Sequence, residues 1–380
     1  QWASVLGESG WVTLIALVGA ALWSLWQRRK PTELWPALAL VAVVVLVLEP
    51  PAPETGALRT LSIQGNLGID DKHGDGKGLS VSDVYKRQAE LTRLGLDAVP
   101  DAEMVLWPET MYPLPVTPEA GEPGSDGFMI RPWTTREEQV PTETLRRANA
   151  QNIRALLGSP DTPPTFVTGG HLYLGVPGKK PWREGEPREP WTWSPRTSEI
   201  LAFDNEGRLQ DHIAKSELVP FGERLPFDGK FPGGEYVAIQ MLRRTKLFPR
   251  FAHSDRTGPL ETAGHVLGGA VCWENVFEAP FRHQADGGAE AFLILSNENW
   301  YGLSEEMDQM VAATRFRAAE TGRSILRVAN TGVTALFDAQ GNERGSLPRG
   351  TRAYFSADLP LIDGGFRTPY QRFGWLAQPL

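Results

Sequence analysis

The first 50 residues are strongly apolar and differ from the rest of the chain. Two uncharged runs, 11–26 and 34–48, are hydrophobic on every helical face, whereas a helix of a soluble protein normally keeps a polar stripe. They hold 16 and 15 residues, and flanking residues extend each toward the roughly 20 that span a bilayer. Tryptophans lie near their ends, where interfacial aromatics collect. We therefore predict two transmembrane helices within 1–50, with buried core helices as the alternative.

The connection between the two runs fixes their direction. It contains Arg28, Arg29 and Lys30, and basic loops stay in the cytoplasm. The second helix then runs outward, so everything after Glu49 lies on the outer side of the membrane. Residues 51–57 are rich in proline and form a stiff linker in this interpretation.

From residue 58 onward, short apolar runs alternate with turns rich in Gly, Pro and Asp, which predicts a mixed α/β sheet layered by helices. One hairpin is predicted over 198–218, with its turn at Asp204–Gly207. The remaining strands are expected within 59–66, 102–110, 163–175, 265–272, 289–300, 324–330 and 331–347, and helices within 274–288 and 305–323.

Three segments interrupt this pattern. Residues 115–150 and 228–262 are expected to be long loops, which usually carry function. The second loop includes 231–251, which alternates apolar and basic residues and is either a surface helix or a segment resting on lipid headgroups. Residues 70–88 are expected to be an exposed loop. Their Asp residues do not make an EF-hand, because His73 and Ser82 occupy two of the ligand positions.

Composition narrows the possible functions. A net charge of −8 gives no reason to expect nucleic acid as a partner. The single cysteine, Cys272, excludes an intramolecular disulfide framework and a multi-cysteine metal site. It is either an inert buried thiol or a lone nucleophile.

Cys272 follows a predicted strand at the start of a predicted helix. A nucleophile at such a turn lies clear of the sheet, near backbone N–H groups and the positive end of the helix dipole. The Gly268–Gly269 pair leaves room beside the strand. None of the six histidines is placed to act as its base.

Two other residues could complete a site. Glu109 in LWPET follows an apolar strand, a setting that raises a carboxyl pKa toward that of a general base. Lys215 in AKSELVPFGERLP precedes a specific turn, and an ammonium beside Cys272 would stabilise a thiolate and an oxyanion. Taken singly, a solvated lysine at Lys215 and a helix N-terminal acid or loop carboxylate at Glu109 remain the alternatives.

WPET, K-x-x-LVPFGE-x-x-P and GHVLGGAVCWE together resemble the carbon–nitrogen hydrolase (nitrilase) superfamily with its Glu–Lys–Cys triad. LVPFGE-x-x-P, LSNENWYG and the segment 315–341 resemble the apolipoprotein N-acyltransferase family in particular. The resemblance covers about 58–375. It implies a four-layer α-β-β-α sandwich of the nitrilase type over 58–368, preceded by the two membrane helices, with 369–380 approaching a further membrane helix that the chain lacks.

The resemblance also implies roles for single residues. Glu109 is then the base, Lys215 the oxyanion and charge stabiliser, and Cys272 the acylated nucleophile. Supporting positions are expected at the acids Glu223 and Glu274, at Trp273, which would supply a backbone N–H, and at Asn297, which would orient the site. A helix N-terminal charge at Glu274 and a strand-end cap at Asn297 are the structural alternatives.

The implied reaction moves an acyl chain from phospholipid, through a cysteine thioester, to the α-amine of a lipoprotein's diacylglyceryl cysteine. The implied location is a bacterial inner membrane with the catalytic domain outside, and neither a metal nor an organic cofactor is required. One alternative is a membrane-tethered amidase or nitrilase that uses water as the acceptor. Another is a catalytically inactive surface-binding module.

Overall fold

The computed structural model describes residues 52–68, 81–130, 139–158, 163–175, 195–220, 222–224, 251–302 and 304–373, with six single positions among the first 23. The predicted membrane runs lie outside these ranges except at single positions of the first run, and so do residues 225–250 and 374–380. Across the described segments, no helix combines the length and hydrophobicity that a membrane crossing requires.

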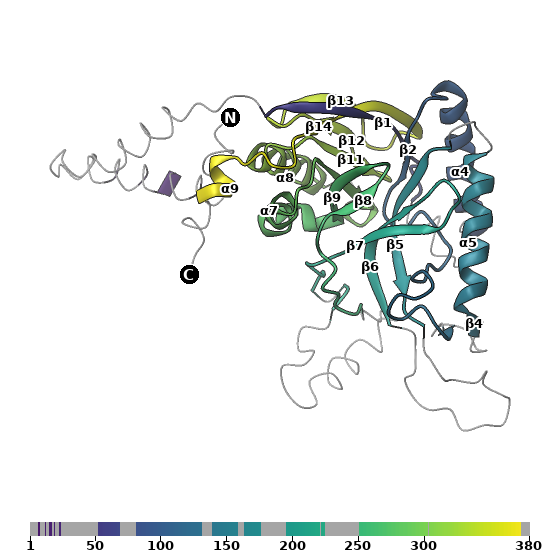
Figure 1. Ribbon diagram of the computed structural model, residues 1–380. Coiled ribbons are helices and arrows are strands. Elements are labelled where there is room, and N and C mark those ends of the chain that lie inside the picture. The colour runs from purple at the N-terminus through teal and green to yellow at the C-terminus, as the bar shows by residue number, and fades with distance from the viewer. Residues whose placement is uncertain are drawn as a thin grey trace, which may run out of the picture.

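Two six-stranded sheets form the centre of the fold (Figure 1). In each, three parallel strands lie in the middle and antiparallel strands flank them: β1, β2 and β5 in the first sheet, and β9, β10 and β11 in the second. The first sheet has the order β14 (Ala353–Ile362), β1 (Glu54–Gln64), β2 (Met104–Trp107), β5 (Thr165–Tyr173), β6 (Arg196–Phe203), β7 (Leu209–Ala214). The second has the order β13 (Glu343–Leu347), β12 (Thr334–Phe337), β11 (Ile325–Ala329), β10 (Ala291–Ser296), β9 (His265–Val271), β8 (Leu260–Thr262).

Three apolar clusters divide the molecule into four layers. One joins side chains of both sheets, such as Leu106 and Leu295, across the middle. A second packs α4 (Val81–Ala98) and α5 (Thr142–Leu157) on the outer face of the first sheet. The third packs α7 (Glu278–Asp286) and α8 (Glu306–Thr321) on the outer face of the second sheet. Figure 1 shows the two helix pairs on opposite sides of the sheets. This arrangement confirms the predicted α-β-β-α sandwich.

The burial of the central strands explains why continuous apolar runs in the sequence predicted strands correctly. β2 and β10 are buried at every position, because parallel strands in the middle of a layered fold are covered on both faces. A continuous apolar run of four to six residues is what such a strand requires.

Several predictions about helices and loops were wrong. Residues 81–88 belong to α4, although 70–88 was predicted as a loop, because Val84 and Leu91 bury against the first sheet. The predicted loop 115–150 contains β3 (Phe128–Ile130), β4 (Gln139–Pro141) and most of α5. The predicted helix 274–288 is split into a 3₁₀ turn, η2 (Cys272–Val276), and α7. β14 was not predicted at all.

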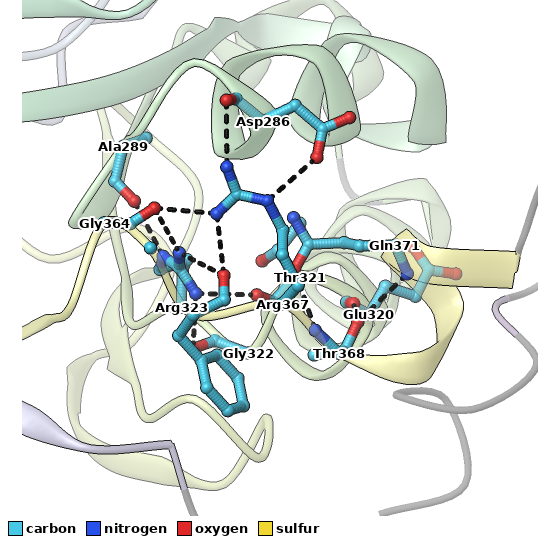
Figure 2. A network of polar contacts seen from close by, with 12 residues as sticks. Asp286, Ala289, Glu320, Thr321, Gly322, Arg323, Gly364, Arg367, Thr368 and Gln371 are labelled. Carbon is cyan, nitrogen blue, oxygen red and sulfur yellow. Dashed lines mark hydrogen bonds and ion pairs between the residues drawn. The ribbon is translucent and has the colours of Figure 1, made fainter.

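Beyond β14 the chain is held to the body by a buried arginine (Figure 2). The Arg323 guanidinium donates to the carbonyl oxygens of Ala289 (2.7 Å), Asp363 (3.1 Å) and Phe366 (2.8 Å). The N–H of Asp363 also donates to the carbonyl of Pro53 (3.3 Å). The segment before β1 and the segment after β14 are therefore neighbours.

Candidate active site

The candidate residues lie just beyond the ends of four strands. Cys272 directly follows β9, Asn297 follows β10, Lys215 follows β7 and Glu109 comes two residues after β2. Because β2, β9 and β10 are central parallel strands, their carboxyl ends are where side chains from remote parts of the chain can meet. The Cys272 thiol hydrogen-bonds the Glu109 carboxylate, and the Lys215 charge acts on both. The structure thus brings Glu109, Lys215 and Cys272 together.

The cysteine occupies a strained turn. Its φ of 56° lies in the left-handed region, which costs a non-glycine residue about 1–2 kcal/mol. The 3₁₀ turn η2 starts at Cys272 itself, so the thiol leaves the sheet at a sharp elbow. Strain of this kind persists where surrounding contacts enforce it, and it is common at functional sites.

Glu109 is positioned by its neighbours in the WPET segment. The Trp107 indole is fully buried and donates to the Thr92 hydroxyl on α4 (2.9 Å), which fixes the end of β2. Thr110 has a φ of 58°, and its N–H donates to the carbonyl of Gly169 (2.8 Å). A Cβ on Gly169 would lie 2.8 Å from the Glu109 Cα, so only glycine lets β5 approach this closely.

Asn297 orients the carboxylate from the second sheet. Its backbone N–H donates to Glu109 Oε2 (3.0 Å), and its side-chain amide donates to the Thr110 hydroxyl (3.1 Å). The Asn297 side-chain oxygen in turn accepts from Asn330 Nδ2 (3.0 Å). The predicted orienting residue therefore contacts the predicted base directly.

Lys215 is fully buried at its side chain and pairs with Glu223, Nζ to Oε1, at 2.9 Å. The other Glu223 oxygen accepts the N–H of Val219 (2.8 Å). The LVPFGE turn thus folds back on itself and returns a carboxylate to the lysine.

Glu274 and Trp273 hold the lysine segment against the cysteine elbow. Glu274 Oε1 accepts from the Ser216 N–H (2.7 Å), the Ser216 hydroxyl (2.7 Å) and the Glu217 N–H (3.2 Å), while Oε2 accepts from the Val271 N–H (3.0 Å). The Trp273 indole donates to the carbonyl of Glu217 (3.0 Å). Glu274 therefore joins the two segments rather than facing the thiol.

Burial and the two carboxylates set the charge states of the site. Burial, with the charge of Glu109, raises the pKa of the Cys272 thiol to about 12, although Lys215 opposes the rise. Burial also raises the pKa of Glu109, with a further rise from Glu223. Burial disfavours the charged Lys215, but Glu109 and Glu223 outweigh it, so the Lys215 pKa is raised and the ammonium persists. The resting site therefore holds a neutral thiol beside a lysine cation.

Two residues that the sequence analysis missed also touch the nucleophile. The hydroxyls of Ser296, at the end of β10, and Tyr301, on the 3₁₀ turn η3 (Glu298–Tyr301), each lie within hydrogen-bonding reach of the Cys272 sulfur. Both lie in the LSNENWYG segment, where an apolar strand ends, and the end of that strand was the available signal.

Two histidines weighed from the sequence have carboxylate partners of their own. His212 pairs with buried Glu199, and His265 lies 3.0 Å from Glu290. In the described part of the chain, no three His, Cys, Asp or Glu side chains are grouped to hold a metal ion.

Residues 194–364 match the profile of the carbon–nitrogen hydrolase family. The chain is 25% identical over 366 residues to the apolipoprotein N-acyltransferase of Shewanella oneidensis, covering 95% of this chain and 61% of the relative. It is 26% identical over 300 residues to that of Chlorobaculum tepidum, covering 77% of this chain and 49% of the relative. The chain thus spans about half to two thirds of these relatives' length.

Two solved structures are similar to the chain over most of its length. An amidase from Nesterenkonia sp. AN1 is 14% identical with a TM-score of 0.48, covering 82% of this chain and 94% of its own. A carbon–nitrogen hydrolase from Helicobacter pylori is 13% identical with a TM-score of 0.48, covering 85% and 94%. By these comparisons, residues 194–364 are similar to the carbon–nitrogen hydrolases, and most of the chain is similar to part of the apolipoprotein N-acyltransferases.

Proposed function

We propose that this protein transfers an acyl chain from phospholipid, through a thioester on Cys272, to the α-amine of a diacylglyceryl cysteine in a bacterial lipoprotein. The observation that carries the proposal is the meeting of three buried groups at one elbow. The Cys272 thiol hydrogen-bonds Glu109, and the Lys215 ammonium acts on both. The relatives that match most of the chain bear the name of this activity.

In the first half-reaction, Glu109 takes the thiol proton as the sulfur attacks the ester carbonyl of the phospholipid. The oxyanion that forms is stabilised by the Lys215 ammonium and by the backbone N–H of Trp273, which already points at the sulfur. When the tetrahedral intermediate collapses, the ester C–O bond breaks and Glu109 returns the proton to the departing lysophospholipid hydroxyl. Cys272 is left as a thioester.

In the second half-reaction, the lipoprotein amine attacks the thioester. Glu109 accepts a proton from the amine, the C–S bond breaks, and the thiolate is reprotonated to give the resting enzyme. The thioester is stable enough to wait for its acceptor and reactive enough toward an amine.

The charge states favour general-base catalysis over a preformed thiolate. A thiol with a pKa of about 12 is neutral at physiological pH, so its proton must leave as the sulfur attacks. Glu109, with its raised pKa, is a stronger base than an exposed carboxylate. Glu223 keeps Lys215 charged and oriented. Glu274 acts through the backbone as a positioning residue.

We also propose that residues 1–50 form two transmembrane helices and that the body lies on the outer face of the inner membrane, with 58–368 as the catalytic domain. Val12, Ile15 and Trp23 are helical and 63%, 65% and 58% exposed, which fits an apolar surrounding. The segment that follows residues 1–50 enters the two-sheet body beside the segment after β14. Such tethering raises the effective concentration of lipid substrates.

The test supplies the purified protein with phospholipid vesicles and a diacylglyceryl peptide, and follows the N-acyl peptide by mass. A Cys272→Ala variant serves as the control. Product that depends on Cys272 supports the proposal. Release of free fatty acid with no N-acyl peptide would indicate a hydrolase with water as acceptor, and a fully inert protein would indicate a binding module.

A further inference from the structure

A buried polar cluster lies behind the cysteine elbow, beneath α8. β9 and β10 are parallel neighbours with Val271 paired to Leu295, so the next residues, Cys272 and Ser296, lie side by side. Ser296 is 1% exposed, and its hydroxyl lies within hydrogen-bonding reach of the Cys272 sulfur.

The same hydroxyl has a second partner. Ser296 Oγ donates to Glu298 Oε1 at 3.2 Å, and Glu298 forms an ion pair with Arg327 on β11. Both ionic side chains are fully buried. A Cβ on Gly332 would lie 1.7 Å from Glu298 Oε2, so the glycine leaves the space that the carboxylate fills.

A serine hydroxyl has one proton and here faces two acceptors, the Glu298 carboxylate and the Cys272 sulfur. In the resting state the thiol proton goes to Glu109, and the Ser296 proton goes to Glu298. Once the sulfur is a thiolate, it becomes the stronger acceptor. Turning the hydroxyl away does not leave Glu298 as an isolated buried charge, because Arg327 still pairs with it.

We infer that Ser296 is a catalytic hydrogen-bond donor to the Cys272 thiolate and that the buried Glu298–Arg327 pair positions its hydroxyl. The inference rests on the proposed thiol nucleophile. No bond to the serine oxygen forms or breaks. Glu109 takes the thiol proton, the sulfur electron pair attacks the acyl carbonyl, and Ser296 keeps its own proton. The same donor stabilises the thiolate when it leaves in the second half-reaction.

The sulfur faces titratable or charged groups from each neighbouring element. These are Glu109 after β2, Lys215 after β7, Tyr301 on η3 and Arg327 on β11. None of them is altered when Ser296 is replaced. A difference between Ser296 variants therefore reports on the hydroxyl.

The test is the rate of iodoacetamide alkylation from pH 7 to 10, measured on the whole chain in detergent. Cys272 is the only thiol, so the signal has one source. Ser296→Ala removes the donor, and Ser296→Thr keeps a hydroxyl. Ser324→Ala is the matched control, because Ser324 is equally buried and lies at the opposite end of the same sheet. Circular dichroism melts confirm that each variant is folded.

Loss of a hydrogen bond to a charged sulfur raises the thiol pKa by about one or more, which lowers the thiolate fraction about tenfold. A thiolate whose thiol has a higher pKa is also more nucleophilic, which offsets part of the lower thiolate fraction. The alkylation rate should therefore fall about fourfold or more. Ser296→Thr should stay within about twofold of the parent, and Ser324→Ala should match it. The inference is overturned if Ser296→Ala alkylates like Ser324→Ala, or if Ser296→Thr is as slow as Ser296→Ala.

The acyl-transfer assay separates this inference from the proposed function. If the protein makes N-acyl product and the Ser296→Ala alkylation profile is unchanged, the role of Ser296 is refuted and the proposed function is supported. If the profile is shifted and the protein makes no N-acyl product, the role of Ser296 is supported and the proposed function is refuted.

Discussion

Replacing Gly169 by alanine tests whether the approach of β5 to Glu109 sets the catalytic geometry. The new Cβ would lie 2.8 Å from the Glu109 Cα and 3.3 Å from its Cβ and N. The nearest atom is backbone, which cannot rotate away. To reach an ordinary contact of 3.4 Å, the two segments must separate by about 0.6 Å.

A displacement of this size has a predictable effect on rate. A 1 Å misplacement at a reacting centre costs about 100-fold, so a shift near 0.6 Å should slow acylation of Cys272 about tenfold. Overpacking should also lower the free energy of unfolding by about 1–3 kcal/mol. The protein should remain folded because the rest of the first sheet is untouched.

The neighbouring glycine provides a matched control. A Cβ on Gly170 would meet only the Leu201 Cδ1 at 3.0 Å, and a leucine tip can move. The assay follows acyl-enzyme formation from phospholipid by intact mass under single-turnover conditions. Gly169→Ala should be about tenfold slow and Gly170→Ala close to the parent. Equal rates in Gly169→Ala and the parent, or equal losses in both variants, would refute the reasoning.

Glu109→Gln should abolish acyl-enzyme formation, which intact mass measures. Its thermal stability should equal or exceed that of the parent in a thermal melt, because the substitution removes a charge that burial disfavours. The pH profile of kcat/KM should have an acidic limb above 4.5, because the active form is the ionised Glu109 and its pKa is raised; a limb at or below 4.5 would exclude Glu109 as the base. Glu274→Gln should lower the free energy of unfolding by about 1.5–3 kcal/mol, since an amide group would face the Val271 N–H or the Ser216 donors without accepting from them. Urea unfolding measures this, and Glu261→Gln, an exposed site on β8, should change it by less than about 0.5 kcal/mol.

The predictions from sequence succeeded where a local pattern of residues is typical of a single structure. The apolar runs 104–107 and 291–296 form central strands, because a strand that is covered on both faces buries its side chains at every position, which favours apolar residues. The hairpin turn at Asp204–Gly207 was also correct, since Gly207 has a φ of 75° that favours glycine.

The failures share a cause, which is long-range packing. α5 has a polar sequence, and its helix is stabilised by the few buried side chains that face the first sheet, such as Ile153 and Leu156. β14 was missed because its partner is β1, some 300 residues earlier, and that pairing leaves no local pattern. Lone polar residues such as Ser296 gained significance only when the strand register placed them beside Cys272.

In the candidate site, too, local motifs indicated the residues, whereas some of their long-range contacts were not predicted. Glu109, Lys215 and Cys272 could be named from motifs, and the structure brings them together. The sequence left Glu274 open between a helix N-terminal charge and a site acid. The structure bears out the first, because Glu274 lies in the first turn of η2 and accepts the N–H of the N-cap residue Val271, and it adds a link to Ser216. The 231–251 segment and the membrane runs stay predictions.

The most direct measurement is the mass of the peptide that carries Cys272 after the protein has been incubated with phospholipid alone. The account predicts an added mass of one acyl chain on that peptide, removable by hydroxylamine and absent in Glu109→Gln. Finding Cys272 unmodified while phospholipid is consumed, or the acyl chain attached to another residue, would contradict it.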